Sequence, residues 1–146
     1  MSEARLWKTL KEGMDHTGHF DRIESHATAQ GRPDVSYCID GREGNIELKV
    51  FDPRRGGFVL RASQNSWFCK HHRAGSERAF ILARYDLSSH GITYLLIRGE
   101  ESRNLIHDRS FETWKKHSTQ VWVDKINWSE LKAVLKGTGS DQASPS

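Results

Sequence analysis

Apolar and polar residues alternate along the chain with two different periods. Between positions 6 and 14 the apolar residues recur three and four apart, which predicts a helix over 3–14 with Ser2 as its N-cap. The apolar runs at 79–85 and 92–97 have no helical period and predict strands, the first of them buried on both faces. This order of elements predicts an α/β fold, a mixed β-sheet flanked by helices.

The stretch 33–49 holds the clearest strand signals. Val35–Ile39 is an apolar run and predicts one strand, and 46–51 predicts a second. The turn-forming residues at 40–44 lie between them, so the two strands are expected to form a hairpin.

Weaker patterns fill in the rest of the chain. They predict, in order, a first strand at 19–25, a helix at 64–74 capped by Ser63, an edge strand at 103–107, a helical turn at 111–117, a strand at 121–123 and a helix at 128–135 capped by Asn127. A single domain over 1–136 is expected, followed by a low-complexity tail at 137–146 that is expected to be disordered.

The predicted hairpin brings charged side chains together. Side chains alternate between the faces of a strand, so Glu47 and Lys49 project from the same face. Asp34 lies at the mouth of the neighbouring strand, so two carboxylates and one ammonium converge there. Mg²⁺ prefers oxygen ligands, and Asp34, Glu47 and the Leu48 carbonyl can supply them.

Composition sets broad limits on the function. Lys and Arg number 22 against 19 Asp and Glu, a net charge of +3 that permits nucleic-acid binding. Cys38 and Cys69 form no C-x-x-C pair, which favours a reduced, intracellular protein. No apolar run is long enough for a membrane span, and the charged segment 2–14 is unlike a signal peptide. A cytoplasmic protein is expected.

These residues resemble the motif of the PD-(D/E)XK nuclease superfamily. Pro33-Asp34 matches its first half and Glu47-Leu48-Lys49 matches E-x-K, while Gln64 resembles the glutamine on the following helix. The order of elements is most similar to the VRR-NUC and Holliday-junction-resolvase branch, in its small, stand-alone phage form. The resemblance covers roughly residues 3–98, and the hairpin spacing together with Gln64 makes it specific.

The resemblance implies a restriction-endonuclease-like core and a Mg²⁺- or Mn²⁺-dependent endodeoxyribonuclease, in the host cytoplasm if the chain is phage-encoded. Asp34, Glu47 and the Leu48 carbonyl would bind the metal, Lys49 would position the attacking water, and Gln64 would orient a group beside it. Branched or junction DNA is the implied substrate. Cleavage of a junction would need two active sites, which a homodimer would supply.

A third carboxylate at the metal has two candidates. Glu24 belongs to the predicted strand beside the hairpin, in an Arg22-Ile23-Glu24 run similar to one in small phage members of the superfamily. Glu3 begins the first helix, at a distance from Asp34 that resembles the spacing in resolvase-like members. Position on the sheet favours Glu24, and the resolvase analogy favours Glu3.

Several basic residues are candidates for contacts with DNA phosphates. Two of them stand at the tip of the 52–57 turn, and the others begin and end the following helix: Arg54, Arg55, Arg61, Lys70 and Arg73.

Other functions are compatible with the same residues. The protein could be a nuclease for RNA or duplex ends, a nuclease-like DNA-binding module without catalysis, or a structural phage protein with a fortuitous motif. The histidines and cysteines fit no zinc-site spacing, and the chain has no P-loop, G-x-G-x-x-G or G-x-S-x-G motif.

Overall fold

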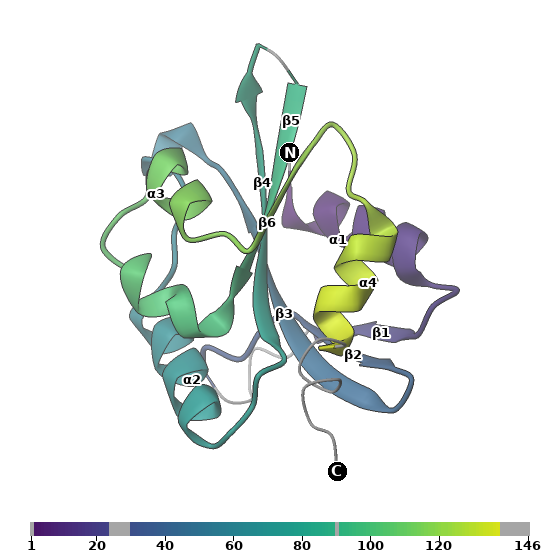
Figure 1. Ribbon diagram of the computed structural model, residues 1–146. Coiled ribbons are helices and arrows are strands. Elements are labelled where there is room, and N and C mark those ends of the chain that lie inside the picture. The colour runs from purple at the N-terminus through teal and green to yellow at the C-terminus, as the bar shows by residue number, and fades with distance from the viewer. Residues whose placement is uncertain (1, 24–29, 90, 138–146) are drawn as a thin grey trace.

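A single mixed β-sheet divides the molecule into two layers of helices (Figure 1). The computed structural model describes residues 2–23, 30–89 and 91–137. Six strands lie in sequence order across the sheet: β1 (His19–Arg22), β2 (Val35–Ile39), β3 (Arg42–Val50), β4 (Ala79–Ser88), β5 (Gly91–Arg98) and β6 (Gln120–Val123). Only the central pair, β3 and β4, is parallel, and each of the other neighbouring pairs is antiparallel. The predicted α/β class with a mixed sheet is confirmed.

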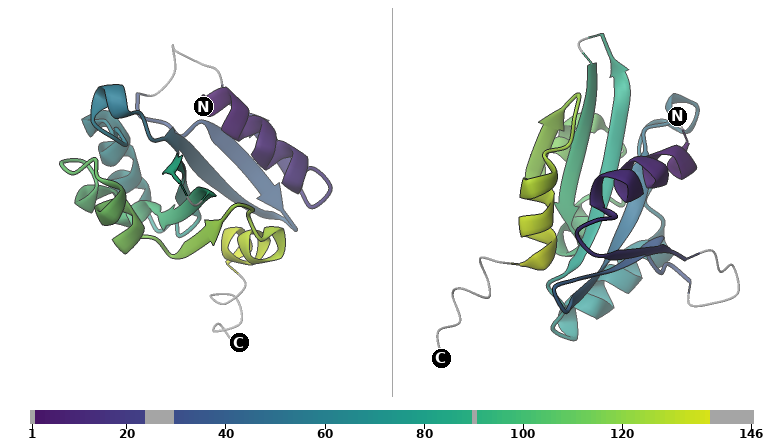
Figure 2. Two further views of the ribbon diagram at one scale, coloured as in Figure 1. Left: turned by 90° about the horizontal axis from the view of Figure 1, so that it is seen from above. Right: turned by 90° about the vertical axis from the view of Figure 1, so that its right-hand side faces the viewer.

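The helices cover both faces of this sheet. Figures 1 and 2 show α1 (Glu3–Met14) and α4 (Trp128–Lys136) on one face, and α2 (Ala62–Arg73) and α3 (Phe111–Lys116) on the other. Two short 3₁₀ helices, η1 (Pro53–Arg55) and η2 (Gly99–Asn104), complete the chain order. Among the described residues, no helix combines the length and the apolar character that crossing a membrane requires.

Alternation along the central strands produces two separate cores. Leu48 of β3 and Leu82 of β4 are buried against α1 and α4. Ile81 and Ala83, one residue out of phase, are buried on the opposite face with Phe68 of α2 and Trp114 of α3. A strand buried on both faces was predicted at 79–85, and the structure confirms it.

The first helix has the predicted bounds and cap. The Ser2 hydroxyl accepts a hydrogen bond from the Arg5 backbone N–H at 3.2 Å. Leu6, Leu10 and Met14 are fully buried, so the helical spacing of apolar residues corresponds to the face that packs on the sheet.

The hairpin turn is tighter than predicted. Asp40 and Gly41 both have positive φ angles, 51° and 80°, and Ile39 pairs directly with Arg42. Positive φ at both central residues is the conformation of a two-residue type I′ turn, which Asp-Gly favours. The second strand therefore begins at Arg42 rather than at position 46.

Two other predictions are corrected. α2 begins at Ala62, because the Gln64 side-chain oxygen accepts the Arg61 backbone N–H at 2.9 Å, so Ser63 is within the helix and is not its cap. The edge strand predicted at 103–107 is wrong: this segment holds the end of η2 and a turn, because the Leu105 side chain is buried in the core beneath α2 and α3.

The predicted helix, strand and helix at the end of the chain are confirmed. Helices form at Phe111–Lys116 and Trp128–Lys136, and the strand Gln120–Val123 lies between them. The Asn127 side chain accepts the Glu130 N–H at 3.1 Å and caps α4 as expected. Of the tail predicted at 137–146, Gly137 is the C-cap of α4, and 138–146 lie outside the described residues.

Candidate active site

The site forms where β3 continues past the end of β2. The register between these strands ends with Val35 opposite Ile46, whereas β3 runs on to Val50. Asp34 precedes β2, and its Oδ2 accepts the Leu48 backbone N–H at 3.1 Å. The side chain of Asp34 thus occupies the edge of β3 that strand pairing does not reach.

Glu47 and Lys49 project toward α2, as their alternation predicts. They are only 2% and 7% exposed, which is unusual for charged residues. The Lys49 Nζ lies 3.4 Å from Glu47 Oε2, so the two groups form a buried ion pair whenever the Glu47 carboxyl is ionised. A buried pair is stable only where hydrogen bonds satisfy the remaining polar atoms.

Gln64 supplies those hydrogen bonds from the first turn of α2. Its Nε2 donates to Glu47 Oε2 at 2.9 Å, and its Oε1 accepts from Lys49 Nζ at 2.9 Å. The same Oε1 accepts the Arg61 N–H, and the Gln64 residue is 3% exposed. Gln64 therefore fixes the carboxylate and the ammonium relative to each other and to the start of the helix.

The second oxygen of Glu47 stands in a different environment. Glu47 Oε1 is buried and accepts no hydrogen bond from the residues that the structure describes, while the carboxyl of Glu47 lies within hydrogen-bond reach of Asp34 if the two share a proton. Burial, together with the negative charge of Asp34, raises the pKa of the Glu47 carboxyl to about 8, against the opposing effect of Lys49. A buried acceptor beside a second carboxylate is an arrangement that a cation would stabilise.

Glu3 takes part in the same electrostatic cluster. It keeps an exposed surface, yet partial loss of surrounding water raises the pKa of its carboxyl. The charge of Lys49 lowers this pKa and the charge of Asp34 raises it, so both act on Glu3 from nearby. Glu24, the other candidate for a third carboxylate, lies outside the described residues.

The available ligands are those of a hard cation. Asp34 and Glu47 provide carboxylate oxygens. The Leu48 carbonyl points to the same strand edge as its N–H, because both groups of a paired residue face one neighbour. Among the described residues, no three His, Cys, Asp or Glu side chains gather as ligands of one ion. Mg²⁺ needs only one or two carboxylates because it retains several waters, and Mn²⁺ accepts the same oxygen ligands.

A groove opens beside this cluster. Its volume is ≈ 560 Å³, and its lining comes from the start of α1, the end of β3, the η1 turn and the end of β4: Glu3, Lys49, Val50, Phe51, Asp52, Pro53, Arg54, Arg55, Gly57, Val59, Asp86 and Leu87. It connects the catalytic candidates Glu3 and Lys49 with the predicted phosphate ligands Arg54 and Arg55.

The other predicted DNA contacts are divided between two places. Arg61 is close enough to Glu3 for its charge to lower the pKa of that carboxyl. Lys70 and Arg73 are in the last turn of α2, and Arg73 is about 13 Å along the helix from Gln64. They would require a nucleic acid that extends along α2.

Sequence reasoning missed Arg109. Its Nη1 donates to the Arg55 backbone carbonyl at 2.5 Å, and its own carbonyl accepts the Phe58 N–H at 3.0 Å. The guanidinium thus joins the arginines of η1. No local pattern could have indicated it, because 54 residues separate the two partners.

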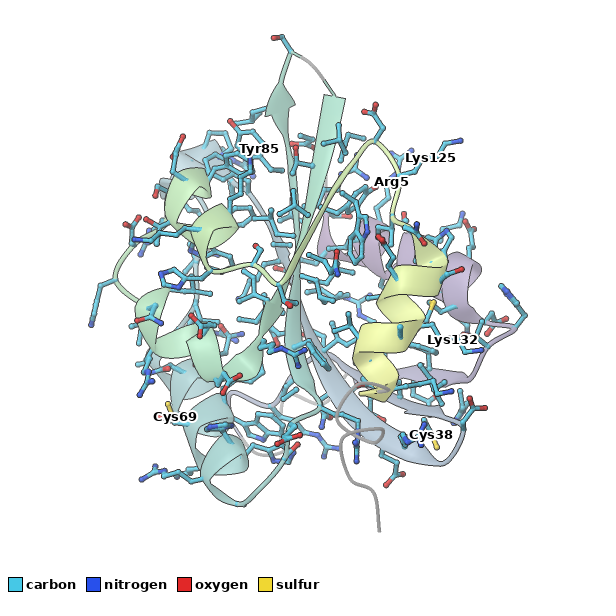
Figure 3. The ribbon with its side chains drawn as sticks, viewed as in Figure 1. Arg5, Cys38, Cys69, Tyr85, Lys125 and Lys132 are labelled. Carbon is cyan, nitrogen blue, oxygen red and sulfur yellow. The ribbon has the colours of Figure 1, made fainter. Side chains whose placement is uncertain are left out.

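The histidines and cysteines take other positions. The His71 ring stacks on Trp67 at a centroid distance of 4.2 Å, and His72 Nε2 lies 3.4 Å from Glu100 Oε2. Cys38 and Cys69 are both free, and Figure 3 shows them far apart, one on β2 and the other on α2.

Comparison of the chain with protein-family models and with curated proteins gives no match. The function is therefore argued from the residues of the site.

Proposed function

We propose that the protein is a Mg²⁺- or Mn²⁺-dependent endodeoxyribonuclease with a restriction-endonuclease-like core. The observation that carries the proposal is the buried oxygen Glu47 Oε1, which accepts no hydrogen bond from the described residues although its carboxyl is crowded against Asp34 and lies beside Lys49. The two crowded carboxylates suit a bound cation, and the ammonium fixed beside them suits a phosphate bound to that cation.

Each residue has a separate part in the proposed reaction. When bound, a divalent ion supplies Lewis acidity and neutralises charge on the phosphate. The Lys49 ammonium has three N–H donors, so it can contact Gln64 and Glu47 and also donate to a phosphate oxygen or to the attacking water. Gln64 holds Lys49 in place, so little reorganisation is needed as charge develops in the transition state.

The same arrangement argues against a DNA-binding module without catalysis. Binding of phosphates gains nothing from two crowded carboxylates, which repel a polyanion and, for Glu47, require burial of a charge. Without a cation, the Asp34–Glu47 pair weakens both folding and phosphate binding. Its presence is explained if the metal is part of the function.

The test is a cleavage panel with labelled single-stranded, duplex, flapped and four-way DNA and one RNA strand. Each substrate is incubated with Mg²⁺, Mn²⁺ or EDTA. The proposal expects metal-dependent cleavage of DNA that Glu47→Gln abolishes without loss of the folded circular dichroism spectrum. Paired cuts on the four-way DNA would indicate a homodimer, which sedimentation would detect. Binding without cleavage in either metal would overturn the proposal in favour of a DNA-binding module.

A further inference from the structure

The groove beside the site has a mixed chemical character. Part of its lining is apolar and comes from Val50, Phe51, Val59 and Leu87. Leu87 is 51% exposed, although most large apolar residues of this chain are buried. An apolar surface beside a phosphate-processing site offers contacts to the non-phosphate part of a nucleotide.

Aromatic packing joins the end of β4 to the end of β3 at the groove. Tyr85, two residues before Leu87 on β4, packs edge-on against Phe51 at a centroid distance of 4.9 Å. Its other contact is with Phe111 of α3, stacked at 4.1 Å. Figure 3 shows Tyr85 on the α3 side of the sheet. The end of β4, which lines the groove through Leu87, is thereby held in position.

The charged side chains of the groove differ in the partners they have. Asp52 accepts the Arg54 backbone N–H at 3.0 Å and so stabilises the η1 turn. Asp86 Oδ2 lies 4.0 Å from the Arg84 guanidinium. Arg55 is exposed in η1 and lines the groove together with Glu3 from the start of α1. A chain of phosphates could therefore run from the metal site toward η1.

We propose, on the basis of the nuclease function argued above, that this groove binds an unpaired nucleotide adjoining the phosphate to be cleaved. Its ≈ 560 Å³ is within the roughly 300–1,000 Å³ of small-molecule sites and suits a nucleotide. In a duplex the base faces are stacked on one another and hidden, whereas an unpaired nucleotide exposes its base and sugar to apolar contacts. The preferred substrate is then DNA with unpaired nucleotides: single strands, flaps or overhangs.

The test measures binding in EDTA, where no cleavage occurs. Fluorescence anisotropy compares a labelled single-stranded oligonucleotide with a blunt duplex of the same sequence. The variant is Leu87→Ser, and Val123→Ser is the matched control, because Val123 is a 61% exposed apolar residue of β6 outside the groove. Thermal melting checks that both variants are folded.

The proposal expects tighter binding of the single strand by the wild type. Leu87→Ser should weaken that binding roughly five- to tenfold, since part of an apolar contact is lost, and leave duplex binding and Val123→Ser unchanged. Equal weakening for both DNA forms, or no difference between the variants, overturns it. If Leu87→Ser selectively weakens single-strand binding but no DNA in the cleavage panel is cut, the nucleotide-binding role of the groove is supported and the nuclease function is refuted. If the protein instead shows metal-dependent cleavage and prefers duplex DNA, the nuclease function is supported and the nucleotide-binding role of the groove is refuted.

Discussion

The stability of the metal-free protein should fall as the pH rises, and Glu47 should be the cause. Burial and the charge of Asp34 raise the pKa of this carboxyl to about 8 in the folded protein, against 4.5 for a free side chain. Between these values the folded state retains a proton that the unfolded state releases. Raising the pH therefore favours unfolding, and the contribution is complete below pH 4.5 and lost above about pH 8.

The size of the effect follows from linkage. One proton released on unfolding changes the free energy of unfolding by about 1.4 kcal/mol per pH unit. Between about pH 5 and pH 7.5 the wild type should therefore lose on the order of 3 kcal/mol. If Mg²⁺ binds at Glu47 as proposed, excess Mg²⁺ should flatten the slope, because it would bind the ionised carboxylate in the folded state only.

Urea unfolding in EDTA at a series of pH values measures this slope. Glu47→Gln should remove the part that Glu47 contributes, since glutamine does not titrate. Glu43→Gln is the matched control, because Glu43 is an exposed glutamate on the same strand, and it should retain the wild-type slope. A Glu47→Gln variant with the wild-type slope would refute the reasoning.

Three further predictions test other parts of the site. Gln64→Leu should lower the free energy of unfolding by about 2–4 kcal/mol in urea titrations, because it removes the hydrogen bonds that Glu47 and Lys49 make to Gln64 in a buried site, whereas Ser66→Ala on the exposed side of α2 should change it by less than about 0.5 kcal/mol. Glu3→Gln should lower the single-turnover cleavage rate at least tenfold or raise the Mg²⁺ requirement; a loss of stability alone would assign Glu3 to the helix dipole. Arg54→Ala and Arg55→Ala should each reduce the salt slope of DNA binding by about one, and an unchanged slope would place them outside the interface.

The parts of the fold that depend on local sequence were predictable. α1 has its predicted bounds because its apolar face and its serine cap are both determined by residues close together in the sequence. The hairpin was predicted for the same reason, and with it the approach of Asp34 to Glu47 across neighbouring strands. Only the length of its turn was wrong, since Asp40-Gly41 suffices for a two-residue type I′ turn.

The parts of the fold that depend on contacts between residues distant in sequence could not be predicted. α2 begins early because Gln64 bonds both to Arg61 and to residues of β3, 15 and 17 positions away. Leu105 and Ile106 form a short apolar pair that suggested an edge strand, but Leu105 is buried in the core with Phe68 of α2 instead. Arg109 reaches η1 from a remote segment. Such contacts exist only once the chain has folded.

The central claim, that Asp34 and Glu47 bind a cation needed for DNA hydrolysis, is tested most directly by the single-turnover cleavage rate across a Mg²⁺ titration. Wild type, Asp34→Asn and Asp15→Asn are compared on the best substrate of the panel, since Asp15 is an exposed aspartate at the end of α1. The account predicts a rate that saturates with Mg²⁺ in the wild type and in Asp15→Asn, and a rate at least about a hundredfold lower in Asp34→Asn at every concentration. Equal rates in all three proteins, or cleavage that persists in EDTA, would contradict it.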